Sequence, residues 1–493
     1  MHAAEPLLVI PSRDIAQCSL HEWARMCSAR LDAGDRLLTL FGRHDTGDQV
    51  VLTAVVQGGA GQFSFLRASA RRGENYPSIT TRHPGVQIFE RELWEQTSIV
   101  PLGHPWLKPV RYEGERQQHM TDYPFFSVRG QEVHEVGVGP IHASVIEPGH
   151  FRFMCLGEQV HHLEIQLGYQ HRGVEALLLQ RPPLALSTLV ESIVGDSCIA
   201  YAWGYCAAME ALAEAPVALE AELVRGVALE LERVAMHLGS LTGLATDIAF
   251  LQGGATYGRL RTAIINASMR VCGSRFGRGW LRPGGVRFGL TDELRRDLAS
   301  TLVAFAKDFA QVNDLMLSAR SVQSRFQGTG VVSQQAAREI GLVGLVARAS
   351  GVAVDTRSSL PGQVYGAYPV ALLTEETGDC WARLRLRMRE IDESVRWITQ
   401  VLQAAERDLS VSTYRAPDRL QPGRLCVSVY EGVRGPVVQV IETGMDGGLA
   451  HYKVQDPSLQ NWFGLALSVR DNEISDFPIC NKSFDLSYCG NDL

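Results

Sequence analysis

The stretch that decides the fold is Glu191-Ser192-Ile193-Val194-Gly195-Asp196-Ser197-Cys198, which leads into an Ala-, Tyr- and Trp-rich helical run through Glu210. Val194 and Ser197 have the spacing of a C-x-x-C pair, which places two side chains on one side of a turn that enters a helix. Two thiolates at that spacing could hold a metal, but neither residue is a thiol. The C-terminal stretch Asp485-Leu486-Ser487-Tyr488-Cys489-Gly490 repeats the spacing with Ser487 and Gly490.

The composition describes a soluble globular protein of more than one domain. The chain has 493 residues, which exceeds one ordinary hydrophobic core and favours two or more domains. Hydrophobic residues make up 45%, charged residues 20%, and the net charge is −7. Basic residues are outnumbered and do not cluster with aromatic ones, so the sequence predicts no nucleic-acid partner.

Neither membrane spans nor metal-binding cysteine sets are visible in the sequence. No apolar stretch reaches the roughly 20 residues of a spanning helix, and the N-terminus lacks a signal pattern, so we expect the chain to stay in the cytoplasm. The ten cysteines have irregular spacings and include no C-x-x-C. This argues against a disulfide framework, a zinc ribbon or an iron–sulfur cluster held by this chain, and we expect no metal site in it.

The chain divides into two predicted domains. Ser19-Leu20-His21-Glu22 is a capping-box start, and β-rich runs follow at 37–41, 50–57 and 63–70. These indicate a small α/β domain over residues 1–115. A polar, Pro-containing stretch at 116–135 is a plausible linker to a second domain over 136–493.

The second domain is predicted to contain a helix bundle flanked by strands. Apolar residues recur at helical spacing in three long segments, which begin at Leu219, Thr291 and about Asp379, the last ending near Leu409. With the run at 196–213 they make a bundle. Strands are expected at 151–155, 427–430 and 437–442, with loops such as 282–286 between the helices. The fold class is therefore α+β.

One polar line on the first long helix has two interpretations. Glu230, Arg233 and His237 recur at spacings of three and four. Such a line is either a solvated face or a buried ionic line, and the sequence does not choose between them.

Several motifs resemble two subunits of respiratory complex I. Glu90-Arg91-Glu92-Leu93-Trp94-Glu95, followed by Gly103-His104-Pro105-Trp106-Leu107-Lys108, resembles the signature of the small peripheral (30-kDa-type) subunit. The segments 139–142, 146–153 and 168–175 resemble the opening of the large (49-kDa-type) subunit and of the large subunit of energy-converting nickel–iron hydrogenases. The resemblance implies a fusion of both subunits, as in formate-hydrogenlyase-type hydrogenases.

The same resemblance implies that a nickel site has been lost. In those hydrogenases four cysteines hold nickel, and their positions fall on Val194, Ser197, Ser487 and Gly490. Ligands of one metal have to lie close together, so we expect the stretches 191–198 and 485–490 to meet in the fold. Nickel there needs soft, deprotonated sulfur ligands, which these residues do not offer. Cys198 and Cys489 each lie one residue from a ligand position. Where the complex I relative carries a tyrosine for the quinone headgroup, this chain has Gly195.

The residues that remain around the former metal site predict proton chemistry. Glu147 matches the proton-handling glutamate of the hydrogenases, and His142, His150 and Arg434 accompany it. Carboxylates and histidines in a cavity can relay protons, because burial and neighbours shift their charge states. The residues expected to line or support the pocket are Glu191, Asp196, Arg233, His237, Arg348, Asp355 and Arg357.

Three functions compete. The favoured one is a peripheral subunit of a membrane-bound oxidoreductase complex of the NADH:quinone oxidoreductase or formate hydrogenlyase type, with its pocket remodelled for quinone or proton coupling. The second is a structural subunit without catalysis, and the least favoured is an active hydrogenase. The resemblance implies an iron–sulfur small subunit with a 4Fe-4S cluster and antiporter-like membrane subunits as partners. It places the chain on the cytoplasmic face of the membrane, held there by those partners, with no cofactor of its own and quinone as a possible substrate.

Overall fold

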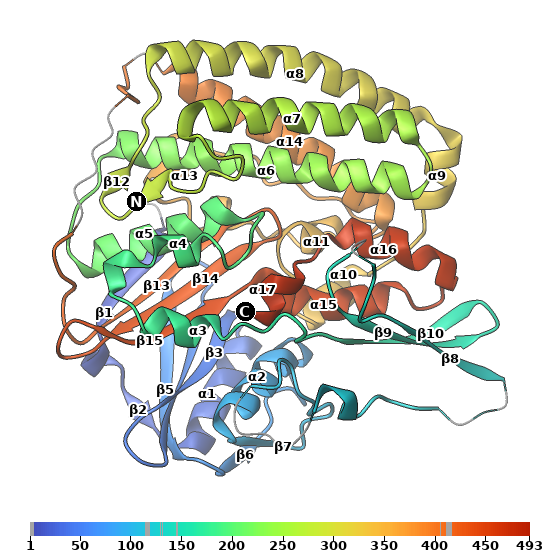
Figure 1. Ribbon diagram of the computed structural model, residues 1–493. Helices are drawn as coiled ribbons and strands as arrows, with labels where there is room; N and C mark the ends of the chain where they lie inside the picture. The colour runs from blue at the N-terminus through green and yellow to red at the C-terminus, as the bar shows by residue number, and fades with distance from the viewer. Residues whose placement is uncertain are drawn as a thin grey trace.

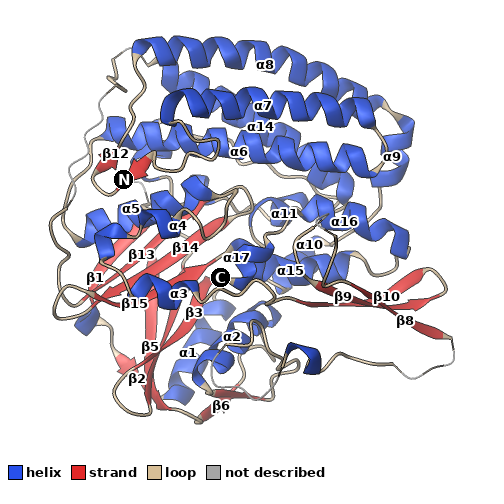
Figure 2. Cartoon of the chain, in the orientation of Figure 1, coloured by secondary structure: helices blue, strands red, loops and turns tan. Residues whose placement is uncertain are grey.

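The computed structural model describes residues 4–113, 119–128, 130, 132–143, 146–404, 406–410 and 417–493. It has a helix layer, a central β-sheet and a smaller α/β part below the sheet (Figures 1 and 2). The predicted α+β class is confirmed. None of the helices in the described part of the chain has the length and apolar character that crossing a membrane requires.

The α/β part is built from the early strands that the sequence predicts. Its sheet has the order β2 (Gln17–Cys18), β5 (Phe63–Arg71), β4 (Gln49–Gln57) and β3 (Arg36–His44). Helices α1 (Leu20–Asp32) and α2 (Gln87–Thr97) pack on it, and β6 (Asn75–Pro77) pairs with β7 (Val100–Leu102). The predicted cap of α1 is confirmed, because the Ser19 hydroxyl accepts a hydrogen bond from the Glu22 amide at 3.3 Å.

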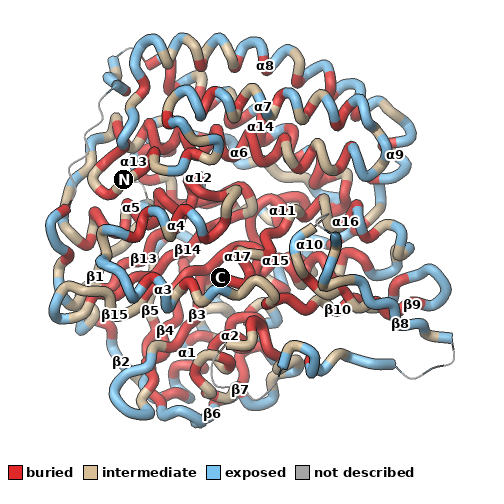
Figure 3. Tube along the Cα trace, in the orientation of Figure 1, coloured by how far each residue is buried: buried red, intermediate tan, exposed pale blue. Residues whose placement is uncertain are grey.

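The central sheet joins the two ends of the chain. Its antiparallel order is β1 (Leu7–Pro11), β13 (Arg424–Glu431), β14 (Pro436–Thr443) and β15 (Leu449–Gln455). One buried hydrophobic cluster contains Leu38 and Val55 of the α/β part together with Leu425 and Val440 of this sheet. The two parts therefore share a core, as the buried residues in Figure 3 also show. A division of the chain at residue 115 stays a prediction.

The helix bundle differs from the predicted one in one member. It consists of α6 (Leu219–Asp247), α7 (Leu251–Cys272), α8 (Asp292–Ser318) and α14 (Cys380–Gln403), which lie side by side in Figure 1. The prediction that the run at 196–213 joins the bundle is wrong. That run forms α5 (Cys198–Leu212), which packs on β13 and β14 and is buried on nearly all sides. The third predicted helix ends at Gln403 rather than near 409.

Short elements complete the structure. The stretch 282–286, predicted as a loop, pairs as β11 (Leu281–Arg282) with β12 (Gly285–Val286). A second sheet, β8 (Val133–Val138), β9 (His150–Leu156) and β10 (Gln159–Gln166), projects to one side in Figure 1. Of the predicted linker 116–135, residues 116–118, 129 and 131 lie outside the described residues, and β8 begins within it. The remaining helices are α3 (Val174–Leu179), α4 (Ser187–Val190), α9 (Arg320–Phe326), α10 (Gln334–Glu339), α11 (Gly344–Ala349), α12 (Thr356–Ser359), α13 (Gly362–Ala367), α15 (Pro457–Ser468), α16 (Phe477–Phe484) and α17 (Tyr488–Asp492).

Candidate functional site

The stretch before α5 and the C-terminal tail lie together. The Arg172 guanidinium donates hydrogen bonds to the Ile193 carbonyl at 2.9 Å and to the Cys489 carbonyl at 3.0 Å. A second guanidinium, that of Arg434, reaches both stretches from the loop between β13 and β14. The expectation that the two stretches meet is therefore confirmed.

Arg434 lies at the centre of this meeting point. Its Nη1 and Nη2 are 2.9 and 2.8 Å from the two carboxylate oxygens of Asp196, and Nη1 is 3.4 Å from the Ser197 hydroxyl. Its Nε donates to the carbonyl of Asp485. Burial opposes the charge of Asp196, yet the paired Arg434 holds the pKa of that carboxyl below its usual range. Asp485 also accepts a hydrogen bond from the Ser240 hydroxyl on α6 at 2.5 Å.

The four residues that the resemblance matches to nickel ligands do not fit nickel. Val194 is packed in the core, and Ser197 and Ser487 are buried. The Ser487 hydroxyl accepts from the Gly490 amide at 2.9 Å and so caps α17. At Gly490 a Cβ atom would lie 2.5 Å from the carboxylate of Asp456. No thiolate belongs to this set, so the donors that nickel needs are missing.

The two nearby cysteines keep their protons. Burial is the main cause that raises the pKa of both thiols, and Glu232 adds to it for Cys198 as Glu147 does for Cys489. A metal ligand has to be a thiolate. These thiols are therefore poor replacements for the lost ligands.

Glu147 lies at an exposed edge of the site. Desolvation raises the pKa of its carboxyl, a hydrogen bond with Gln170 lowers it, and the charge of Asp196 raises it further, so that the net pKa is raised. Its sequence neighbours Ile146 and Pro148 line a cavity of about 490 Å³, together with Pro140, Ile141, His142, Ala143 and Tyr169. A mostly apolar cavity in the loop of a carboxyl with a raised pKa can take a hydrophobic substrate that is protonated when it is reduced.

His142 and His150 hold the loop that carries Glu147. His142 Nε2 donates to the Gly149 carbonyl at 2.7 Å, and His150 Nδ1 donates to the Gly139 carbonyl at 3.1 Å. Each ring thus has one nitrogen occupied by the backbone. Their predicted part in proton transfer stays a prediction.

Glu191 serves the neighbouring hairpin. Its carboxylate accepts from the Arg282 guanidinium at 2.5 Å and from the Gly279 amide at 2.9 Å. It is buried, and both contacts fix the turn that carries β11. Both bonds go to Oε1, so the Glu191 carboxylate supports the wall of the site and does not offer both oxygens to a ligand.

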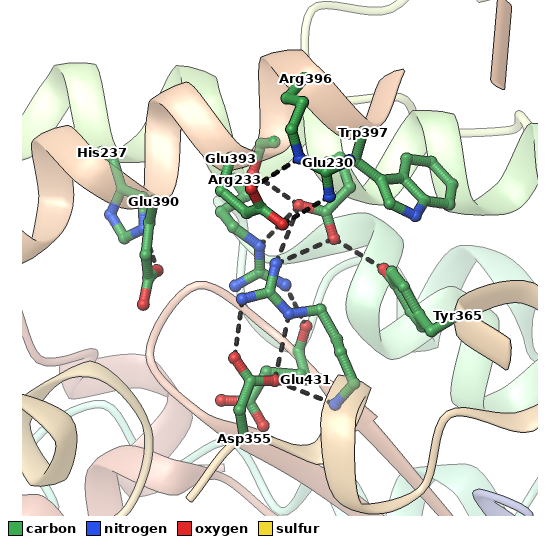
Figure 4. A network of polar contacts seen from close by, with 12 residues as sticks. Glu230, Arg233, His237, Asp355, Tyr365, Glu390, Glu393, Arg396, Trp397 and Glu431 are labelled. Atoms are coloured by element: carbon green, nitrogen blue, oxygen red, sulfur yellow. Dashed lines mark hydrogen bonds and ion pairs between the residues drawn. The ribbon is translucent and has the colours of Figure 1, made fainter. Parts of the chain in front are cut away.

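The polar line on α6 is a buried ionic line. Glu230, Arg233 and His237 are fully buried, so the alternative of a solvated face is wrong. They belong to a larger set, which we call the ionic cluster and which Figure 4 shows in part. Its members are Glu230, Arg233, His237, Arg348, Asp355, Arg357, Glu390 and Glu431.

The ionic cluster connects four parts of the chain. Arg357 is 3.1 Å from Glu230 and 2.7 Å from Asp355, and Arg348 contacts Asp355, Glu390 and Glu431. Arg233 donates to the carbonyls of Glu431, the last residue of β13, and of Gly432, which begins the loop that carries Arg434. The cluster therefore braces the loop that carries Arg434.

Sequence reasoning missed four partners in this cluster. They are Glu390, Glu431, Tyr365 and Ser394, the last two donating hydroxyl hydrogen bonds to Glu230 at 2.6 Å. Arg387, Glu390 and Ser394 recur at spacings of three and four on α14, as the polar line on α6 does. A polar line on each of two helices that also have apolar faces is the sequence pattern that could have indicated a buried ionic contact between α6 and α14.

Comparison with known proteins gives relatives over most of the chain. Residues 247–421 match the family model of the respiratory-chain NADH dehydrogenase 49 kDa subunit. The sequence is 29% identical over 440 residues to formate hydrogenlyase subunit 5 of Escherichia coli (strain K12), covering 84% of this chain and 76% of that protein. It is 30% identical over 381 residues to NADH-quinone oxidoreductase subunit 4 of Thermus thermophilus, covering 72% of this chain and 92% of that subunit.

A solved structure has the same fold. A chain from the membrane-bound sulfane sulfur reductase, an archaeal respiratory membrane complex, superposes with a TM-score of 0.69 at 22% identity. The match covers 74% of this chain and 99% of that chain.

Proposed function

The chain belongs to the family of the 49 kDa subunit of respiratory-chain NADH dehydrogenase, and on that premise we propose that it is the large peripheral subunit of a membrane-bound oxidoreductase complex. We further propose that residues 1–115 replace the separate small peripheral subunit. The expected partners are an iron–sulfur subunit and antiporter-like membrane subunits, on the cytoplasmic face of the membrane.

The proposed site is a nickel-free pocket that couples electron transfer to protons. The observation that carries this proposal is the position of Arg434, which pairs through two contacts with Asp196 of one stretch and donates a hydrogen bond to the Asp485 carbonyl of the other. A complementary ion pair keeps the two stretches in place without a metal. The two stretches thus lie together although the thiol ligands are absent, which supports a changed function over a lost fold.

Quinone reduction is the chemistry that the neighbouring groups support best. A quinone takes up two electrons and two protons as it becomes a quinol, and we propose that the electrons come from an iron–sulfur cluster of the partner subunit. The apolar cavity beside Glu147 would hold the ring, with Ile141 and Ile146 against it. The raised pKa of Glu147 favours its protonated form, so Glu147 would give one of the two protons to a quinone oxygen, and water at the open side of the cavity would give the other. His142 would position the Glu147 loop through its bond to Gly149.

A structural subunit is the second candidate. The bonds of His142 and His150 to backbone carbonyls favour it, because rings used in this way hold a loop rather than carry protons. Its prediction is distinct: the complex would need the chain for assembly and not the Glu147 carboxyl for turnover.

The experiment is quinone reduction by the purified membrane complex with wild-type chain, Glu147→Gln or Glu135→Gln. Glu135 is an exposed carboxylate on β8 paired with Arg152 and serves as the control. We expect Glu147→Gln to lower the rate by about 100-fold, since positioned acid–base groups contribute about that much or more, and Glu135→Gln to leave it unchanged. Wild-type rates in Glu147→Gln would favour the structural subunit.

A further inference from the structure

His237 is a buried base with an unused nitrogen. Its side chain is fully buried, and its Nε2 lies 2.8 Å from a carboxylate oxygen of Glu390. Because a carboxylate can only accept, Nε2 carries the hydrogen and Nδ1 keeps a bare lone pair. Nδ1 is buried and has no hydrogen-bond partner among the described residues. Buried nitrogens are normally satisfied, so this one needs a reason.

The formal charges of the eight residues in the ionic cluster sum to −1 when His237 is neutral. Its carboxylates Glu230, Asp355, Glu390 and Glu431 contribute −4 and its three guanidiniums contribute +3, which leaves −1 when His237 is neutral. A proton on His237 would bring the sum over these eight residues to zero, and Arg387, which interacts with Glu390 from outside this set, adds one positive charge in either state. Glu390 would then face an imidazolium at hydrogen-bond distance, a favourable arrangement for both groups.

In the state described here the proton is absent at neutral pH. Burial is the main cause that lowers the pKa of His237, to about 4, while Glu390 raises it and Arg387 and Arg233 lower it further. Arg348 and Arg357 also act on Glu390. Other charged groups on the elements packed around the pair are Arg261 on α7 beside Gly239, Lys482 on α16 beside Gly243, and Asp485, which interacts with Arg387. Removing positive charge, or adding negative charge nearby, would favour protonation.

Two helices connect the pair to the pocket around Arg434. On α6, Ser240 follows His237 by three residues, so the two side chains share one face, and Ser240 donates to Asp485. On α14, Arg387 precedes Glu390 by three residues and donates to the Ser483 carbonyl at 2.7 Å. The Arg387 guanidinium interacts electrostatically with Glu390, Asp485 and Arg434. The His237–Glu390 pair therefore lies one helical turn from groups of the pocket.

The far side of the ionic cluster meets a second cavity. Thr356, Arg357, Tyr365 and Glu431 belong to the wall of a cavity of about 300 Å³ that also borders the N-terminal segment at Pro6. Tyr365 and Arg357 both bind Glu230. This cavity reaches the part of the cluster formed by Arg357, Tyr365 and Glu431, and we take it as the place where a proton enters from solvent.

We propose that His237, held by Glu390, is a buried proton-accepting site whose occupancy is linked to the charge in the pocket of Arg434 and Asp485. Negative charge that arrives in the pocket draws a proton from solvent onto Nδ1, and by reciprocity a proton on His237 favours the arrival of that charge. The link to electron transfer rests on the proposed function, whereas the proton site itself does not.

The test is nitrogen-15 NMR of histidines in the full chain as a function of pH. His237→Gln identifies the signal, and through-bond correlations do so when that variant fails to fold. We expect wild-type His237 to be neutral at pH 7 with the hydrogen on Nε2. Arg387→Met should raise the titration midpoint by about one pH unit or more, and Asp485→Asn should lower it.

Arg396→Met is the matched control, because Arg396 lies on the same helix, half exposed, and pairs with Glu393. It should leave the midpoint unchanged. Equal midpoints in wild type, Arg387→Met and Asp485→Asn, or a hydrogen on Nδ1 at pH 7, would overturn the proton site. A responsive His237 in a complex that reduces no quinone would overturn the proposed function alone.

Discussion

Arg434 and Asp196 form an ion pair through two parallel contacts of 2.9 and 2.8 Å, although one residue follows β13 and the other precedes α5. We expect Arg434→Lys to weaken this connection, because lysine keeps the charge and loses the planar two-donor fork. Asp196 is 38% exposed, so solvent screens the pair, and the expected loss in unfolding free energy is about 1–2 kcal/mol.

Urea unfolding of the full chain measures this loss. Arg396→Lys, at the half-exposed position on α14, is the control and should change the free energy by less than about 0.5 kcal/mol. Equal unfolding free energies of Arg434→Lys and wild type would show that the two-donor contact of the guanidinium does not stabilise the packing of the two stretches.

The tight packing at Gly490 gives a second prediction. A methyl group there would lie 2.5 Å from the carboxylate of Asp456, which accepts hydrogen bonds from the Tyr201 hydroxyl at 2.5 Å and the Ser458 amide at 2.7 Å. Gly490→Ala should therefore destabilise the protein by about 1–3 kcal/mol. At Gly195 the same methyl group would meet nothing within 4 Å, so Gly195→Ala should be close to neutral. Thermal unfolding compares the two, and equal shifts would contradict the packing described.

The helices and strands that could be predicted from the sequence are those with a clear periodicity of apolar residues. Strands β4 and β5 and the apolar face of α6 were predicted because alternation and helical spacing report burial on one side. Helix α7 was missed, since Gly253, Gly254 and Gly258 interrupt its pattern. Helix α5 was placed in the wrong layer, because an apolar surface on all sides indicates burial and not which element provides it.

The sequence could indicate which residues belong to the site, but not which of them contact one another. The two stretches around Ser197 and Ser487 were expected to meet, and they do. That Arg434 would bind Asp196 was not visible, because the contact joins residues far apart in the chain. Glu390 was missed because a carboxylate with charged neighbours on a helix gives the same sequence pattern on a solvated face and on a buried one.

The pH dependence of stability tests the state of His237. Its folded pKa is lowered to about 4 from the ordinary 6.5, so the unfolded chain binds the proton first as pH falls. Stability should therefore be lost between about pH 6.5 and pH 4 and be regained as pH rises. In His237→Gln the loss between pH 7 and pH 4.5 should be smaller by about 2–3 kcal/mol. Urea unfolding at both pH values, with exposed His21→Gln as control, measures the difference, and an unchanged loss in His237→Gln would contradict the lowered pKa.

Association with the membrane should depend on partners. The described residues include no helix fit to cross a membrane, and we propose that the chain is attached to the membrane through other subunits. Fractionation should find the chain with membranes when the neighbouring subunits are present and in the soluble fraction when they are deleted. Retention on membranes of the chain expressed alone would contradict the proposed attachment.

Nickel dependence tests the central claim most directly, which is that this subunit works in electron transfer without a metal at Val194, Ser197, Ser487 and Gly490. The membrane complex would be purified from cells grown with and without nickel, and its quinone reduction and nickel content would be measured on the same samples. The account predicts equal rates and no stoichiometric nickel in either sample, because the thiolate ligands are missing. A rate that falls without nickel, together with one nickel per complex when it is supplied, would contradict it.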